Sequence, residues 1–454
     1  MRAWRGFMAL VCAGFLMSAA SPGPDMTVFQ LENGLRVILR EKPNSPLVGI
    51  AVAVNVGIKD ESESTSGLVH LLEHLVLLGG TARQNGILKN DEIRSCGGFV
   101  NAHTDNDLLT YQASFPAAQL TKALQLVKES VFDLQANSFE LAGEKKIILE
   151  EIAQIRDDAT ERGTQLVLQN LFSGHPYGKP LYGNETVIAN ATLDELARLH
   201  RRWFVPANTT LALVGSFDAA AGVRAEIEKI FGVTVAATAP FTPAEIPAIA
   251  EPLPKRIDIA QTMDINEAHL FVGFLAPAID HPDHAAMTVL AHVLGDGPDP
   301  LLNSAFRLAG HQVERIAVRY FAFKYGGVML IHLRLDPDHL PAVSSELLKF
   351  LSAASQMSYS EEDFSPQERA TQIDRLQSAR DQIRLDSEQY QEQGLATALY
   401  LARYLHLTDQ AADAKKRKAV AEVSSANLRK TAWNWLKGKK HVMVSITPTP
   451  PPGK

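Results

Sequence analysis

The H-x-x-E-H segment between Gly67 and Leu75 constrains this chain more than any other stretch of its sequence. His70, Glu73 and His74 stand among mostly apolar residues, a pattern that predicts a buried helix. On a helix, His70 and His74 lie about 40° apart and Glu73 lies about 60° from His70, so the three side chains share one face. Two neutral imidazoles one turn apart are half of a zinc site, and a neighbouring carboxylate can take a proton from a water that the metal activates. The alternative is a buried helix with two histidines by chance, so the decision depends on finding the other ligands.

The helical pattern from Phe139 to Asp158 contains carboxylates that suit this role. Glu144 and Glu151 are seven residues apart and hence within about 20° of each other, whereas Glu150 points away. The ordinary explanation for each glutamate is a solvated face. Glu144 and Glu151, however, lie on the apolar side of the helix, where a charge without a partner is costly. We therefore predict Glu151 as the third metal ligand and Glu144 as a group that supports the site.

We expect Thr65 or Ser66 to cap the N-terminus of the histidine helix, because a hydroxyl side chain can accept a hydrogen bond from a free backbone N–H there.

Length, composition and charge limit the class of protein. With 454 residues, 46% of them hydrophobic and 21% charged, the chain has the composition of a soluble globular protein with several sizeable cores. Its net charge of −7 argues against nucleic acid as the main partner.

The N-terminus has the pattern of a secretory signal peptide, predicted over residues 1–20. Arg2 and Arg5 precede an apolar run, and small residues follow at Ser18-Ala19-Ala20. The alternative is a short N-terminal anchor, but the apolar run is too short to span a bilayer comfortably, so we expect no stable membrane anchor. After cleavage the chain keeps one cysteine, Cys96, and hence no internal disulfide. These features predict a periplasmic or secreted protein.

Residues 241–256 are rich in alanine and proline and predict a linker between two domains. We expect an N-terminal zinc-binding domain at 21–240, a C-terminal domain at 257–446 without the zinc motif, and a flexible tail at 447–454. The second half repeats the order of the predicted elements of the first with a period of about 220 residues, which indicates duplication.

The sequence resembles the insulinase/pitrilysin group of zinc metallopeptidases, whose motif is H-x-x-E-H. It is most similar to the shorter members related to mitochondrial processing peptidase. The resemblance rests also on Leu31-Glu32-Asn33-Gly34-Leu35-Arg36-Val37, Gly79-Gly80-Thr81, Gly97-Gly98, Asn101-Ala102, His175-Pro176-Tyr177-Gly178 and Val214-Gly215. Glu151 follows His74 by 77 positions, which matches the spacing of the third ligand in the family.

The resemblance implies that His70, His74 and Glu151 bind one Zn²⁺ per chain and that Glu73 is the general base. Glu144 matches the family's supporting glutamate.

The resemblance also implies an α+β fold of two homologous halves, each an antiparallel sheet packed with helices. The halves would enclose a chamber that admits peptides and excludes folded proteins. Asn101 and Ala102 would lie on an edge strand to which the substrate adds as a further strand.

One position departs from the family pattern. Active members have an arginine and, seven residues later, a tyrosine in the second half, which hold the substrate backbone and the tetrahedral oxyanion. Arg307 matches the arginine, but Glu314 stands at the tyrosine position, where a carboxylate would repel an oxyanion. Tyr320 could replace the tyrosine if the alignment shifts. We therefore predict a heteromer in which a homologous partner subunit supplies an Arg–Tyr pair.

The predicted function is that of a zinc-dependent endopeptidase acting on extended peptides through metal-activated water. One alternative is a non-catalytic structural or partner-binding subunit of the same fold. A second is a zinc protein with another hydrolytic task.

Overall fold

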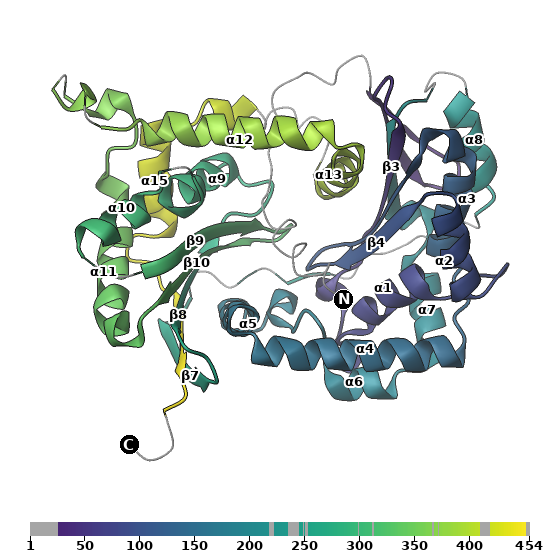
Figure 1. Cartoon of the computed structure of the whole chain (residues 1–454), viewed down its shortest axis with the longest axis horizontal. Coiled ribbons are helices and arrows are strands. Elements are labelled where there is room, and N and C mark those ends of the chain that lie inside the picture. The colour runs from purple at the N-terminus through teal and green to yellow at the C-terminus, as the bar shows by residue number, and fades with distance from the viewer. Residues whose placement is uncertain are drawn as a thin grey trace.

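The computed structural model describes residues 26–217, 222–234, 245–247, 249, 253–297, 299–310, 313–365, 367–370, 372–408 and 418–450. Figure 1 shows two groups of helices and strands, one from each half of the chain. The first half contains β1 (Met26–Gln30), β2 (Arg36–Glu41), β3 (Leu47–Val54), α1 (Leu68–Leu78), α2 (Gly86–Ser95), β4 (Phe99–Thr104), β5 (Leu109–Pro116), α3 (Leu120–Phe132), α4 (Ser138–Asp157), α5 (Ala159–Leu171), α6 (Glu185–Asn190), α7 (Leu193–Trp203), β6 (Thr209–Gly215) and α8 (Gly222–Phe231). The second half contains β7 (Ile257–Met263), β8 (Ala268–Ala276), α9 (His284–Ala291), α10 (Leu301–Leu308), β9 (Val313–Ala322), β10 (Gly327–Leu335), α11 (Leu340–Ala353), α12 (Arg375–Glu392), α13 (Gly394–Leu407), α15 (Ser425–Trp435) and β11 (Val442–Pro448).

Each half contains one sheet, and the two sheets have the same strand order. The first sheet runs β1-β2-β6-β3-β5-β4 and the second runs β7-β11-β8-β10-β9. Without β1, the first order matches the second strand for strand, as expected for a duplicated unit. The predicted α+β class with two similar halves is therefore confirmed. Each sheet also contains one parallel pair, β2–β6 and β7–β11, so the sheets are mixed rather than wholly antiparallel.

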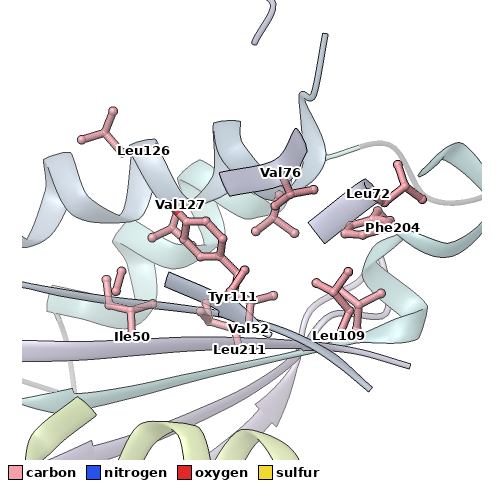
Figure 2. Packing of buried hydrophobic residues seen from close by; sticks show 14 of the residues in the cluster. Ile50, Val52, Leu72, Val76, Leu109, Tyr111, Leu126, Val127, Phe204 and Leu211 are labelled. Atoms are coloured by element: carbon pink, nitrogen blue, oxygen red, sulfur yellow. The ribbon is translucent and has the colours of Figure 1, made fainter. Parts of the chain in front are cut away.

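The histidine helix α1 packs on one face of the first sheet. Leu72 and Val76 are buried in a layer that includes Tyr111 of β5 (Figure 2). Side chains two positions apart on a helix point in directions about 200° apart. His70 and His74, which stand two positions before and after Leu72, therefore point away from the sheet. Helix α4 lies on that side.

The other face of each sheet is covered by a helix from the other half (Figure 1). Helix α13 of the second half packs on β3 and β6 of the first sheet, and α5 of the first half packs on β8 and β11 of the second. The buried side of α13 consists of Ala398, Leu401, Ala402, Tyr404 and Leu405. The buried side of α5 consists of Ala159, Leu166, Val167 and Leu171. The two halves are therefore joined by an exchange of helices, which the sequence pattern did not predict.

Small residues make this exchange sterically possible. Ala51, Ala53 and Ala212 line the sheet face beneath α13. A Cβ on Gly49 of β3 would collide with the backbone of Leu395 at the start of α13. The missing side chain thus allows helix and strand to meet at backbone distance.

Several predicted segments lie partly or wholly outside the described residues. These are the signal peptide at 1–20, much of the linker at 241–256, and residues 451–454 of the tail. The tail prediction begins too early, because β11 continues to Pro448 in parallel pairing with β7. Among the described residues, every helix is too short or too polar to cross a lipid bilayer.

Candidate metal centre

A buried carboxylate holds the N-terminus of α1. Glu61 accepts hydrogen bonds from the backbone N–H of Gly67 at 2.9 Å and of Val69 at 2.8 Å. These are two of the N–H groups that a helix start leaves without a partner. The prediction that Thr65 or Ser66 is the cap was wrong, because the N-cap is Gly67 in a left-handed conformation. Burial raises the pKa of Glu61 to about 8, although both hydrogen bonds favour its charged form.

A buried lysine holds the other end of the same helix. Lys89 of α2 is fully buried, and its Nζ donates a hydrogen bond to the carbonyl of Val76 at 3.0 Å. This carbonyl belongs to the last turn of α1, where backbone acceptors lack helical partners. Burial lowers the pKa of Lys89 to about 8. Both ends of the histidine helix are thus fixed by buried ionisable side chains that sequence spacing did not reveal.

Helices α1 and α4 bring the three predicted ligands together. Glu151 Oε2 lies 3.6 Å from His70 Nε2 and 3.7 Å from His74 Nε2, and all three atoms lie within 4.8 Å of one another. A tetrahedral zinc ion with nitrogen and oxygen ligands spaces its donor atoms about 3.4 Å apart. The buried Oε2 of Glu151 also makes no hydrogen bond within the described part of the chain. The donor set and its spacing therefore fit zinc.

Glu144 orients the second histidine. Its Oε2 lies 2.9 Å from His74 Nδ1, which leaves Nε2 of the same ring to face Glu151. Hydrogen bonds of this kind fix the tautomer and the ring orientation of metal-binding histidines. Burial alone would lower the pKa of His74, but the bond to Glu144 and the charge of Glu73 outweigh it and raise the pKa.

The electrostatics of His70 differ from those of His74. Burial, together with the neighbouring His74 and His103, holds the pKa of His70 well below its usual value. Metal binding requires an unprotonated imidazole, so this environment keeps His70 ready to bind. Burial also raises the pKa of the Glu151 carboxyl, while the positive charge of His74 opposes this rise.

Glu73 lies on α1 between the two histidines and is buried. It is not a member of the three-ligand cluster, although its charge acts on both His74 and Glu151. This position agrees with the predicted role of Glu73 as general base, which stays a prediction.

The predicted substrate strand is at the edge of the first sheet. β4 is the terminal strand of that sheet and pairs with β5 on one side, with Asn101 opposite Gln112 and Ala102 opposite Tyr111. Its other side has no strand partner among the described residues. Such an edge can accept an added strand, so the geometry agrees with the predicted roles of Asn101 and Ala102, which stay predictions.

The second half places no predicted residue at this centre. Arg307 is exposed at the end of α10, and no contact within the described residues joins it to the cluster. Glu314 accepts a hydrogen bond from Arg334 at 3.2 Å. Tyr320 is buried in the core of the second half, and its hydroxyl donates to the carbonyl of Pro277 at 2.7 Å. This burial and this hydrogen bond argue against Tyr320 as a replacement for the missing tyrosine.

One further aromatic residue borders the cluster. The ring of Tyr182 meets the ring of His70 edge to face, with centroids 5.0 Å apart. No sequence signal pointed to Tyr182, because it stands in a turn far along the chain from α1 without any periodic relation to it.

The paired α+β halves and the His–His–Glu cluster define a two-domain protein with a candidate zinc centre. Two family models match the chain: Insulinase (Peptidase family M16) over residues 36–185 and Peptidase M16 inactive domain over residues 190–369. The chain belongs to this family, the insulinase-type M16 zinc metallopeptidases. The match of its second half to the inactive domain agrees with the absence of H-x-x-E-H there.

The two relatives described next both carry the name zinc protease. An uncharacterized zinc protease of Mycobacterium tuberculosis is 28% identical over 62% of this chain and 63% of its own length. Zinc protease PqqE of Helicobacter pylori is 27% identical over 70% of this chain and 73% of its own length. The chain thus spans less than two thirds of the length of the mycobacterial relative.

Solved structures share the fold over nearly the whole chain. A protease from Helicobacter pylori superposes with a TM-score of 0.77 at 20% identity, covering 93% of this chain and 99% of that one. A peptidase M16 inactive domain from Pseudomonas fluorescens gives 0.76 at 19% identity, covering 94% and 98%.

Proposed function

We propose that this chain is a zinc-dependent endopeptidase that hydrolyses extended peptides. The observation that supports this most directly is the convergence of His70, His74 and Glu151 beside the buried carboxylate of Glu73. A scaffold protein needs neither the three donors nor the costly burial of a fourth charged group beside them.

The chain's own residues divide the work. His70, His74 and Glu151 would hold the zinc, and Glu144 fixes the ring of His74. Zinc bound here would polarise a carbonyl and lower the pKa of water. Glu73 takes the proton of the attacking water and returns it to the leaving amine, which is the role of a general base that becomes a general acid.

The edge strand β4 supports the choice of an extended peptide as substrate. A peptide that adds to β4 satisfies its own backbone N–H and C=O groups against those of Asn101 and Ala102. A folded protein offers no such free strand, so unfolded segments and short peptides are the expected substrates.

The test combines metal content with turnover. The purified chain should hold about one zinc and cleave internally quenched peptides, and Glu73→Gln should retain the metal while losing turnover. Zinc without cleavage of any peptide in a random library would favour the non-catalytic subunit of the same fold. Cleavage of esters or phosphoesters instead of peptides would favour a zinc protein that catalyses another kind of hydrolysis.

We further propose that the active form is a heteromer in the periplasm or outside the cell. Glu314 occupies the position at which the family has an oxyanion donor, and its carboxylate is bonded to Arg334. Tyr320, the replacement that the sequence offered, donates to the carbonyl of Pro277 in the core. A homologous partner with an Arg–Tyr pair would supply the missing donor, while Arg307 would contact the substrate backbone.

Assaying the chain alone, and then with the exported product of a neighbouring gene of the same family, tests the heteromer. Removal of one oxyanion donor typically costs about 10²–10³ in rate, so the partner should raise turnover by a similar factor. Strong activity of the isolated chain, unchanged by the partner and by Glu314→Tyr, would exclude the heteromer but not the peptidase.

A further inference from the structure

The two histidines of the candidate centre are supported by different forces. His74 Nδ1 is bonded to the Glu144 carboxylate at 2.9 Å. The Nδ1 of His70 is equally buried, but it makes no hydrogen bond within the described part of the chain. The ring of His70 instead meets the ring of Tyr182 at 5.0 Å between centroids, with the ring planes 88° apart. Aromatic rings favour this edge-to-face arrangement.

A close backbone contact fixes the position of Tyr182. Gly67 at the start of α1 and Gly183 both have positive φ, and a Cβ on Gly67 would lie 2.8 Å from the Cα of Gly183. The backbone N–H of Asn184 donates to the carbonyl of Ser66 at 3.1 Å. The turn that contains Tyr182 is therefore locked to the first turn of the histidine helix.

Tyr182 also lines a cavity of about 260 Å³. The lining includes Ile152, which directly follows Glu151 on α4, and Ile155, one turn beyond Glu151. A smaller, non-aromatic side chain at position 182 would join this cavity to the imidazole of His70. The ring would then have room to turn, because no hydrogen bond at Nδ1 holds it.

We infer that Tyr182 is the positioning residue of His70, and that its aromatic ring performs for His70 what the Glu144 carboxylate performs for His74. This inference rests on the metal centre of the proposed function. Tyr182 acts through His70 and does not itself bind the metal. The ring, rather than the hydroxyl, keeps Nε2 of His70 directed at Glu151.

Zinc affinity, measured by competition with a chromophoric chelator, tests the inference. An edge-to-face pair is worth a factor of about 2 to 10 in an equilibrium constant, so Tyr182→Leu should weaken zinc binding by about that factor. Tyr182→Phe keeps the ring and should bind zinc as the native chain does. Ile155→Ala enlarges the same cavity without removing the ring, so it is the matched control and should leave the affinity unchanged.

The visible spectrum of the cobalt-substituted protein gives a second readout, because it reports the geometry of the ligands. The spectrum should change in Tyr182→Leu and stay unchanged in Tyr182→Phe. Thermal unfolding of the metal-free variants checks that they are folded, and Tyr182→Met, which matches the length of the side chain more closely, replaces the leucine variant if that one is not.

Native zinc affinity and an unchanged cobalt spectrum in Tyr182→Leu would overturn the inference. An equal loss in the leucine and phenylalanine variants would also overturn it, because the hydroxyl would then be the important group. Neither readout uses a peptide. A chain that binds zinc tightly but cleaves nothing would refute the proposed function and leave this inference standing, whereas a native chain without zinc affinity would refute both.

Discussion

The two halves of the molecule share the strand order of their sheets but differ in the side chains that their corresponding helices direct toward neighbouring helices. Helix α1 of the first half turns Leu72 and Val76 to its sheet and two histidines to α4. Its counterpart α9 is buried along its whole length and directs Met287 and Leu290 into an apolar core. The scaffold is thus maintained by the apolar pattern in both halves, and the chemistry depends on a few polar residues that one half has and the other lacks.

The partner helices differ in the same way. Helix α4 buries the Glu144 carboxylate against His74. Helix α12, which precedes the exchanged helix α13 as α4 precedes α5, has a buried side of Leu376, Ala379, Ile383 and Ser387. A buried carboxylate is costly without a partner, and the two histidines of α1 supply partners for Glu144 and Glu151.

The largest effect is expected from substitution of the candidate metal ligands, which the second half lacks. Glu151→Gln and His74→Ala each remove one of three donors, so both variants should lose bound zinc and all turnover. Metal analysis after dialysis measures this. Glu150→Gln is the matched control, because Glu150 is exposed and pairs with Lys146 on the far side of α4. Full zinc retention by both ligand variants would show that the cluster is not the metal site.

A smaller loss is expected when the ligands stay and the proton carrier is removed. Glu73→Gln should keep its zinc, because Glu73 lies outside the ligand triangle. The peptidase rate should fall by about 10²–10⁴, the usual worth of a positioned general base. Comparison of kcat/KM with metal content separates the two effects, and a normal rate in this variant would contradict the assigned role.

The sequence predicted the ligands because each pair lies on one helix, where spacing determines direction. His70 and His74 are one turn apart, and Glu144 and Glu151 are two turns apart. The pairing of these two helices came from the family resemblance and from the cost of burying charge. Periodicity also supported two similar halves, since strands and helices recur in the same order.

Other features depend on contacts that neither helical periodicity nor strand alternation marks. Glu61, Lys89 and Tyr182 act on α1 from three different loops or helices, and no local pattern marks them. The exchange of α5 and α13 was equally invisible, because an apolar helix face does not specify which sheet it covers. The parallel strand pair of each sheet arises when the last strand of a half returns beside an early one, β6 beside β2 and β11 beside β7, which is a property of topology rather than of any residue.

Each half covers the sheet of the other half with one of its helices. We therefore expect that neither half is stable alone. Leu401→Ala on α13 should destabilise the first sheet, and Leu171→Ala on α5 the second, each by about 2–5 kcal/mol for a buried leucine. Denaturant unfolding followed by fluorescence and circular dichroism should show one shared transition in both variants. Leu385→Ala is the control, because Leu385 is exposed. Two separate transitions, of which only one shifts, would show independent halves.

Removal of the Glu144 charge, which supports His74, should weaken zinc binding less than removal of His74 itself. Glu144→Gln keeps a hydrogen-bond acceptor near His74 Nδ1 but loses the negative charge. Groups in this position are typically worth a factor of about 10–100 in metal affinity. Chelator competition should therefore place this variant between the native chain and His74→Ala. An affinity equal to that of the native chain would mean that the Glu144 charge is not needed.

The smallest effect is expected in the second half, at the residue whose identity first indicated a partner subunit. Glu314 is about half exposed, and its bond to Arg334 is a surface ion pair that Arg334 shares with Glu267. Such pairs contribute little, so Glu314→Gln should change the free energy of unfolding by less than about 0.5 kcal/mol. If the partner subunit supplies the oxyanion donor, the rate of the assembled enzyme should also stay unchanged. Glu73→Gln in the same assembly controls for sensitivity. A large loss of rate in Glu314→Gln, with unchanged stability, would instead place Glu314 in the active site. The second half would then contribute to catalysis as well as to the scaffold.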